Sequence, residues 1–252
     1  MADIFSLANK VILITGAGKG IGNYLANKLS EEKAIVYGID IKFLNTNKKI
    51  SPNLNQIKCD ITHKKFFDKV CESIFRNHKK IDVLINNAGL SFPSKSETYG
   101  KINWEKTLAV NLTASYFCSL SVINFMRKNN AGSIINITSL NAEQAFPKNP
   151  AYIASKGGLK MLGKSLAKDW GKFGIRVNNL GPGYIKTDMT KKSFNNKKTR
   201  LAREKQTLLG RWGEIDDLVG PCIFLASDAS NYITGQDIYV DGGWLANSGI
   251  PN

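Results

Sequence analysis

The chain has 252 residues, a length that suits one large α/β domain, and it can bury a substantial core without disulfide or metal staples. Its hydrophobic content of 42% and charged content of 22% are ordinary for a globular protein, and its four scattered cysteines form no Cys-x-x-Cys motif, so we expect reduced thiols and a cytoplasmic location. The net charge of +15 raises the question of a nucleic-acid partner, but the lysines occur in scattered doublets without interleaved aromatic residues, so we expect a solvated surface and no nucleic acid.

The first predicted strand, Val11 to Thr15, is an unbroken apolar run of the kind that is buried on both faces of a parallel sheet. It continues into a glycine-rich turn, residues 16–22, and a predicted helix from Asn23 to Glu31. In a strand, turn and helix of this kind, bare backbone N–H groups and a helix N-terminus can face the pyrophosphate of a dinucleotide. The sequence therefore predicts a dinucleotide site here.

The second predicted strand, residues 34–39, ends at Asp40, about 20 residues beyond the glycines. A carboxylate there can accept hydrogen bonds from the adenosine ribose hydroxyls and would repel a 2′-phosphate. Lys19, in the glycine turn, could instead pair with such a phosphate. We favour NAD over NADP, because two anions facing each other in a desolvated pocket are costly, whereas an exposed lysine can swing away.

Strands and helices then alternate to the end of the chain. We predict strands at 55–59, 82–86, 132–138, 175–180 and 237–240, and helices at 62–77, 103–128, from Tyr152 to Trp170, and 214–225. This pattern indicates an α/β fold: one domain over residues 1–252, with a Rossmann-type doubly wound sheet of seven mainly parallel strands and helices on both faces. An eight-stranded barrel is the rival, and we reject it because of the strand count and the phosphate-type first loop.

Tyr152 and Lys156 lie four residues apart, so on a helix both side chains reach the same small volume. An ammonium about 4 Å from a phenol in partly buried surroundings can lower the pKa of the phenol by roughly 3 units. Such a pair is a sensible proton-transfer device, although the spacing alone is common on amphipathic helices. Its significance depends on the other motifs of the chain.

A polar, basic segment at 187–210 interrupts the alternation. Between Lys191 and Lys205 it carries seven cations against one acid, Glu204: Lys191, Lys192, Lys197, Lys198, Arg200, Arg203 and Lys205. These charges could steer an anionic substrate. We favour the plainer interpretation of a solvated face.

Several short motifs stand in a characteristic order: Thr15-Gly16-x-x-x-Gly20-x-Gly22, Asn86-Asn87-Ala88-Gly89, Asn111, Ser139, Tyr152-x-x-x-Lys156, and Pro182-Gly183 followed by Thr187. Together they resemble the short-chain dehydrogenase/reductase family over essentially the whole chain. Within that family, the start of the chain and the segments 210–213, 224–230 and 240–246 most resemble gluconate 5-dehydrogenases and the neighbouring 2-deoxygluconate 3-dehydrogenases.

The resemblance implies a catalytic group. Tyr152 would exchange a proton with the substrate oxygen, and Lys156 would lower the pKa of Tyr152 and hold the nicotinamide ribose. Ser139 would orient the same substrate oxygen, and Asn111 would hold a water that relays protons from Lys156. Without the family pattern, we would interpret Ser139 and Asn111 as structural.

The resemblance also implies the cofactor contacts. The residues expected to bind it are Gly16, Lys19, Gly20, Ile21, Asp40, Asp60, Ile61, Asn87, Gly89, Tyr152, Lys156, Pro182, Gly183, Ile185 and Thr187. Gly16, Gly20 and Ile21 would line the pyrophosphate, and the 187–210 segment would form a substrate lid. No metal is expected, because His63 and His78 have no ligand-type neighbours in the sequence.

The leading hypothesis is an NAD-linked oxidoreductase that interconverts a secondary alcohol and a ketone on a small, anionic sugar acid such as gluconate. One alternative is an NADPH-dependent 3-oxoacyl-thioester reductase, which Lys19 favours and Asp40 disfavours. Another is a dinucleotide-sensing regulator without turnover, which would not need the proton-transfer residues. The family resemblance implies a homotetramer, and we expect no membrane span because no apolar run is long enough.

Overall fold

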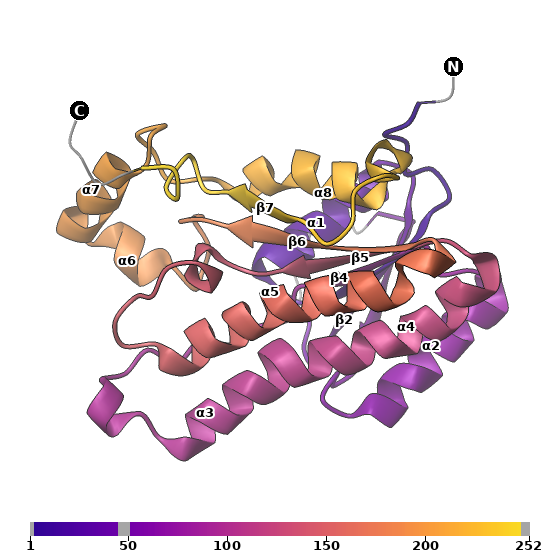
Figure 1. Ribbon diagram of the computed structural model, residues 1–252, viewed down its shortest axis with the longest axis horizontal. Coiled ribbons are helices and arrows are strands. Elements are labelled where there is room, and N and C mark those ends of the chain that lie inside the picture. Colours follow the sequence, from indigo (N-terminus) through magenta and orange to yellow (C-terminus); the bar gives the residue numbers. More distant parts are fainter. Residues whose placement is uncertain (1–2, 45–50, 248–252) are drawn as a thin grey trace.

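Seven parallel strands form a single sheet in the order β3-β2-β1-β4-β5-β6-β7 (Figure 1). The computed structural model describes residues 3–44 and 51–247. The strands are β1 (Val11–Thr15), β2 (Ile35–Asp40), β3 (Leu54–Lys58), β4 (Val83–Asn86), β5 (Gly132–Ile137), β6 (Ile175–Pro182) and β7 (Asp237–Val240). This arrangement confirms the predicted doubly wound sheet. The strand order reverses between β1 and β4, and in such sheets ligands bind at the carboxyl ends beside this point.

Helices cover both faces of the sheet (Figure 1). One face carries α1 (Gly20–Glu31) and α8 (Val219–Ala226), and the other carries α2 (Lys64–His78), α4 (Ser115–Asn129) and α5 (Pro150–Trp170). Successive side chains of β1 point to opposite faces of the sheet. Ile12 and Ile14 belong to the apolar cluster on one face, and Val11 and Leu13 belong to the cluster on the other. All four are fully buried, which explains why this strand has no polar face in the sequence.

The predicted helix 103–128 has different bounds and is not regular. It begins as α3 (Lys101–Leu108) with Gly100 as its N-cap, continues as a π-helical turn η2 (Ala109–Ala114), and then becomes α4. Asn103, the first residue of the predicted helix, lies inside α3, and its carbonyl accepts a hydrogen bond from the Thr107 hydroxyl at 2.7 Å. The wide turn contains Asn111, and π-turns of this kind are frequent at functional sites.

The combined helix 101–129 bears on the expectation of no membrane span. It has 29 residues and is long and apolar enough to cross a membrane by length and composition. However, 44% of its most apolar stretch is buried inside the molecule, and core helices of globular proteins pass the same test. The exposed remainder is a surface feature that needs its own explanation.

Two further elements differ from the prediction. The helix expected at 214–225 is a 3₁₀ turn, η5 (Ile215–Leu218), followed by α8, and Pro221 fits there because the first turn of a helix needs no N–H from it. The 187–210 segment contains two short helices, α6 (Lys191–Asn195) and α7 (Lys197–Gln206). The remaining 3₁₀ turns are Ser96–Thr98, Leu140–Ala142, Gly171–Phe173 and Asp228–Ser230.

A row of buried amides ties β4, β5 and β6 together and reaches the first residue of β7. Asn86, Asn136 and Asn179 stand in register on β4, β5 and β6, and consecutive side chains hydrogen-bond at 3.0 Å. The row ends where Asn179 donates to the Asp237 carboxylate on β7 at 2.7 Å. Because a slip by one residue would break every bond in the row, it fixes the strand ends that present the site.

Candidate active site

The glycine turn between β1 and α1 is packed on one side and open on the other. A Cβ atom at Gly16 would lie 2.7 Å from the Ala88 Cα, so this glycine allows the turn to touch the loop after β4. Gly20, at φ +59°, has nothing within 4 Å of the corresponding position. The α1 N-cap, Lys19, makes no side-chain capping bond, and the first turn carries no acidic residue. Within the described part of the chain, the turn therefore fits an anion such as a pyrophosphate.

Two side chains hold this turn in shape. The Asn87 amide donates to the carbonyls of Thr15 and Gly16, both at 3.0 Å. The Asp40 carboxylate, at the end of β2, accepts the Gly18 N–H at 2.8 Å. Since each carboxylate oxygen can accept more than one hydrogen bond, Asp40 can brace the turn and still receive ribose hydroxyls.

The other expected cofactor residues lie around the same edge of the sheet. Asp60 follows β3 and accepts two hydrogen bonds from Thr62, while Ile61 is buried beside it. Pro182 ends β6, and Ile185 is buried three residues later. Thr187 is held by Thr190, whose hydroxyl accepts the Thr187 N–H at 3.0 Å. All are placed by the carboxyl ends of strands, where this fold binds ligands.

Ser139, Tyr152 and Lys156 converge just beyond β5. Ser139 follows that strand closely, whereas Tyr152 and Lys156 lie one turn apart on the facing part of α5. Tyr152 is hydrogen-bonded with Ser139. The Lys156 Nζ is 5.6 Å from the centroid of the Tyr152 ring and donates to the Ile137 carbonyl at 2.7 Å. The structure thus brings the three predicted catalytic groups together.

Burial dominates the protonation of this group. Burial raises the pKa of Tyr152, and the hydrogen bond with Ser139 opposes that shift. Burial lowers the pKa of Lys156 to about 8, because a 3% exposed ammonium has lost most of its water. In the free protein burial raises the pKa of Tyr152, opposite to the lowering expected from an ammonium, and the Lys156 ammonium donates to a backbone carbonyl. That lowering stays a prediction for the loaded enzyme.

Asn111 connects the π-turn to this group. Its side chain accepts the Leu90 N–H at 2.8 Å and donates to the Leu90 carbonyl and to the Ser155 hydroxyl, both at 3.0 Å. A methyl group placed on Gly89 would lie 3.7 Å from both the Asn111 Oδ1 and the Lys156 Nζ. Gly89 therefore borders a space between the two side chains, which suits the expected water relay.

Sequence reasoning missed one residue that orients Ser139. The Ser139 hydroxyl donates to the Asn141 Oδ1, and the Asn141 N–H donates back to the Ser139 Oγ, both at 3.2 Å. Asn141 lies in the 3₁₀ turn that follows β5. A serine and an asparagine two residues apart often hydrogen-bond to each other's backbone in a local turn, so the sequence could have suggested that Asn141 orients Ser139.

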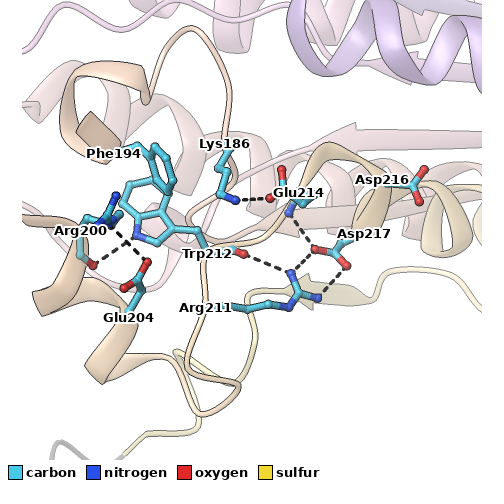
Figure 2. Close-up of a pocket in the computed structure, with 9 residues that line it drawn as sticks. All are labelled: Lys186, Phe194, Arg200, Glu204, Arg211, Trp212, Glu214, Asp216 and Asp217. Carbon is cyan, nitrogen blue, oxygen red and sulfur yellow. Dashed lines mark hydrogen bonds and ion pairs between the residues drawn. The ribbon is translucent and has the colours of Figure 1, made fainter. Parts of the chain in front are cut away.

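The larger of two described cavities, about 490 Å³, lies against the 187–210 segment and is not lined by Ser139 or Tyr152 (Figure 2). Its charged walls are already paired: Lys186 with Glu214, and Arg211 with Asp217 at 2.7 and 2.9 Å. Trp212, only 2% exposed, donates its indole N–H to the Arg200 carbonyl at 3.3 Å. This cavity is therefore a feature of the 187–210 segment, separate from the place where Ser139 and Tyr152 meet.

Comparison with known proteins decides the family. A family model described as Enoyl-(Acyl carrier protein) reductase matches residues 16–245, which include the glycine turn and all three catalytic candidates. The 5-keto-D-gluconate 5-reductase of Escherichia coli (strain K12) is 36% identical over 97% of this chain and 99% of its own. The chain belongs to the short-chain dehydrogenase/reductase family.

As a short-chain dehydrogenase/reductase, the protein is an NAD(P)-dependent oxidoreductase that acts on CH–OH groups. The 2-dehydro-3-deoxy-D-gluconate 5-dehydrogenase of Bacillus subtilis (strain 168) is also 36% identical, over 97% of this chain and 98% of its own. The crystal structure of a gluconate 5-dehydrogenase from Burkholderia cenocepacia J2315 in complex with NADP and tartrate superimposes with a TM-score of 0.89 at 31% identity, covering 97% of this chain and 98% of that one.

Proposed function

We propose that this short-chain dehydrogenase/reductase interconverts a secondary alcohol and a ketone on a small sugar acid such as gluconate. The convergence of Ser139, Tyr152 and Lys156 at the carboxyl end of β5 carries the reaction type. Full-length similarity to relatives named for gluconate and its keto and deoxy derivatives supports the substrate class.

Each catalytic residue has a chemical task at the substrate oxygen. Tyr152 moves a proton to or from it, and the hydroxyl of Ser139 donates a hydrogen bond that orients it. Lys156 keeps most of its positive charge at pH 7, since its pKa is about 8. Asn111 holds the backbone of Leu90 in place and borders the space for a relay water. A bound nicotinamide cofactor supplies the hydride chemistry.

The residues that would hold the cofactor are those of the glycine turn and its surroundings. The open face of Gly20 and the uncapped N-terminus of α1 suit the pyrophosphate, and Asp40 suits the adenosine ribose. We infer a preference for NAD over NADP from Asp40, and Lys19, which is exposed and free to move, does not offset it. Solved relatives have been crystallised with NADP, so the family as a whole does not dictate NAD. A measured preference of this chain for NAD would therefore point to Asp40.

A substrate panel tests the proposal. D-gluconate, a neutral polyol and a 3-oxoacyl thioester would each be assayed with NAD(H) and NADP(H), following the absorbance of the reduced nicotinamide. We expect turnover of the sugar acid with NAD. Turnover of only the thioester with NADPH would support the acyl-thioester reductase instead, and cofactor binding without any turnover would support a regulator.

The Asp40→Ser variant tests the cofactor preference. Removing the carboxylate should raise kcat/KM for NADP by about 10-fold or more, the effect of removing roughly 1.4 kcal/mol of charge repulsion. Lys19→Ala is the matched variant, and it should lower any residual NADP activity. An unchanged NAD to NADP ratio in the Asp40 variant would contradict the assignment.

Two further properties stay proposals. We propose a homotetramer, following the family resemblance and the exposed apolar surface of helix 101–129. We also propose a cytoplasmic location, supported by the four buried cysteines, none of which forms a disulfide.

A further inference from the structure

The cations of the 187–210 segment are not equivalent once they are placed in the fold. All five lysines of the segment are exposed (Lys191, Lys192, Lys197, Lys198 and Lys205). The two arginines, on the inner side of α7, are half-buried. Arg200 pairs with Glu204 at 3.8 Å, but no carboxylate of the described residues lies within ion-pair distance of Arg203. A half-buried cation without an anion is costly, so Arg203 is the one lid cation that needs an explanation.

Aromatic rings hold Arg203 in place. Its guanidinium carbon lies 4.0 Å from the centroid of the Tyr184 ring and 5.4 Å from that of Trp212. The Arg203 side chain also makes a hydrogen bond with the Tyr184 side chain. A guanidinium has five N–H donors, so others stay available for a further partner. The group is therefore pre-positioned, whereas the exposed lysines of the same segment are free to move.

The same rings connect Arg203 to the catalytic loop. Tyr184 directly follows Gly183 beyond β6, and its ring packs edge-on against Phe146 at 5.9 Å. Phe146 lies in the segment 139–149, which joins β5 to α5. The lid helices α6 and α7 lie toward the carboxyl ends of the strands (Figure 1). Arg203 is thus linked through Tyr184 and Phe146 to the segment that begins with Ser139.

Neighbouring cations cannot take the same role in this arrangement. Lys186 contacts Glu214, and Arg211 makes two bonds to Asp217, as Figure 2 shows. Each of these charges is neutralised by its own partner. Arg203 is left as the half-buried cation that an incoming anion could neutralise.

We propose that Arg203 binds the carboxylate of the substrate and so selects sugar acids over neutral sugars and polyols. This inference rests on the proposed function, because it assigns one end of the same substrate. A planar guanidinium can make two parallel hydrogen bonds to a carboxylate, which fixes its orientation as well as its charge. The carbon that reacts is then held at a set distance from the anchored end.

The test uses Arg203→Met, which keeps the length and packing of the side chain but removes its charge. Its kcat/KM for D-gluconate, and for 5-keto-D-gluconate in the reverse direction, should fall at least about 30-fold, as expected for the loss of a charge-assisted hydrogen-bonded pair. KM for the cofactor and the activity on D-glucitol, which has a neutral terminus, should stay within about 3-fold. Lys205→Met, on the exposed side of α7, is the matched control and should behave as wild type.

A rescue experiment separates binding from a structural role. Guanidinium ion added to Arg203→Ala should restore part of the gluconate activity and none of the D-glucitol activity. Equal losses on acid and neutral substrates, or no rescue, would overturn the assignment of Arg203. If the wild-type protein turns over neither acid, the proposed function and this inference both fail. If the wild-type protein turns over the acids and Arg203→Met does so equally well, only the inference fails.

Discussion

At the residue scale, the site combines a buried lysine with a half-buried tyrosine. Lys156 is 3% exposed and makes one described hydrogen bond, to the Ile137 carbonyl. Burying a charged group in this way costs stability, so function and folding make opposite demands on this residue. Tyr152 carries the complementary feature, since its burial favours the neutral phenol that can donate a proton.

The clearest test at this scale is Tyr152→Phe, which removes the hydroxyl and keeps the ring. Loss of a positioned acid/base should lower kcat by about 10²- to 10⁴-fold, and cofactor affinity should change little because the ring still packs. Single-turnover kinetics would measure the rate of the chemical step, and quenching of tryptophan fluorescence by NADH would measure the cofactor affinity. A variant with near wild-type kcat would show that another group transfers the proton.

A second residue-scale prediction concerns stability and pH. The pKa of Lys156 is lowered from 10.5 to about 8 on folding, so between these pH values the unfolded chain binds a proton that the folded chain does not. The cost of the buried charge is full below pH 8 and disappears as pH rises toward 10.5. Lys156→Met should therefore raise the free energy of unfolding at pH 7 by about 1–3 kcal/mol, while abolishing activity.

Urea unfolding of the wild type and Lys156→Met at pH 7 and pH 10 would measure this difference. The stabilisation should shrink at the higher pH, because the wild-type lysine is then mostly neutral in the folded state. A variant that is less stable than the wild type at pH 7 would mean that the Ile137 hydrogen bond outweighs the cost of burial.

At the element scale, α5 approaches the sheet so closely that one position tolerates no side chain. A Cβ atom at Gly163 would lie 2.4 Å from the Asn179 Oδ1 and 3.0 Å from the Asn136 Nδ2, within the buried amide row. The same helix places Tyr152 and Lys156 eleven and seven residues earlier. The amide row therefore sets the height of the catalytic helix above the strand ends.

Gly163→Ala tests this contact, with Gly157→Ala in the same helix as its control. The first should destabilise the fold by about 1–3 kcal/mol, because the methyl group forces the amide row or the helix to shift. The second has nothing within 4 Å of the new methyl group and should stabilise by about 0.5–1 kcal/mol through helix propensity. Thermal unfolding of both variants would compare them, and equal effects would mean that α5 can move away from the sheet without cost.

The elements that the sequence predicted well are those with a strong pattern. The fully buried run of β1 and the glycine turn after it left few alternatives, and the same holds for β4 and β5. The π-turn was not predictable, because Ala109 to Ala114 is compatible with an ordinary helix and only the tertiary contacts of Asn111 reveal the wider turn. The role of Arg203 was hidden for a similar reason, since a run of charges does not show which member faces inward.

At the scale of the whole molecule, the outer face of the helical layer carries exposed apolar side chains. Ile102 is 78% exposed and Met161 61% exposed, and Tyr116 adds an aromatic ring between them in sequence. Helices α4 and α5 run in the same direction, as connections between parallel strands require, and Leu112 of the π-turn η2 meets Gly158 of α5. Tyr116 and Met161 lie about one turn beyond this contact, on α4 and α5, and we take these exposed side chains as one apolar patch.

A second copy of the chain is the occupant that the family resemblance implies for this patch, within a homotetramer. The double variant Tyr116→Lys, Met161→Lys should break the contact, because two like charges would then have to be buried at a symmetric interface. Sedimentation velocity should show a tetramer for the wild type and a smaller species for the variant. Tyr232→Lys, at a fully exposed tyrosine outside this patch, should remain tetrameric. A monomeric wild type would contradict the proposal and leave the apolar face of helix 101–129 to some other partner.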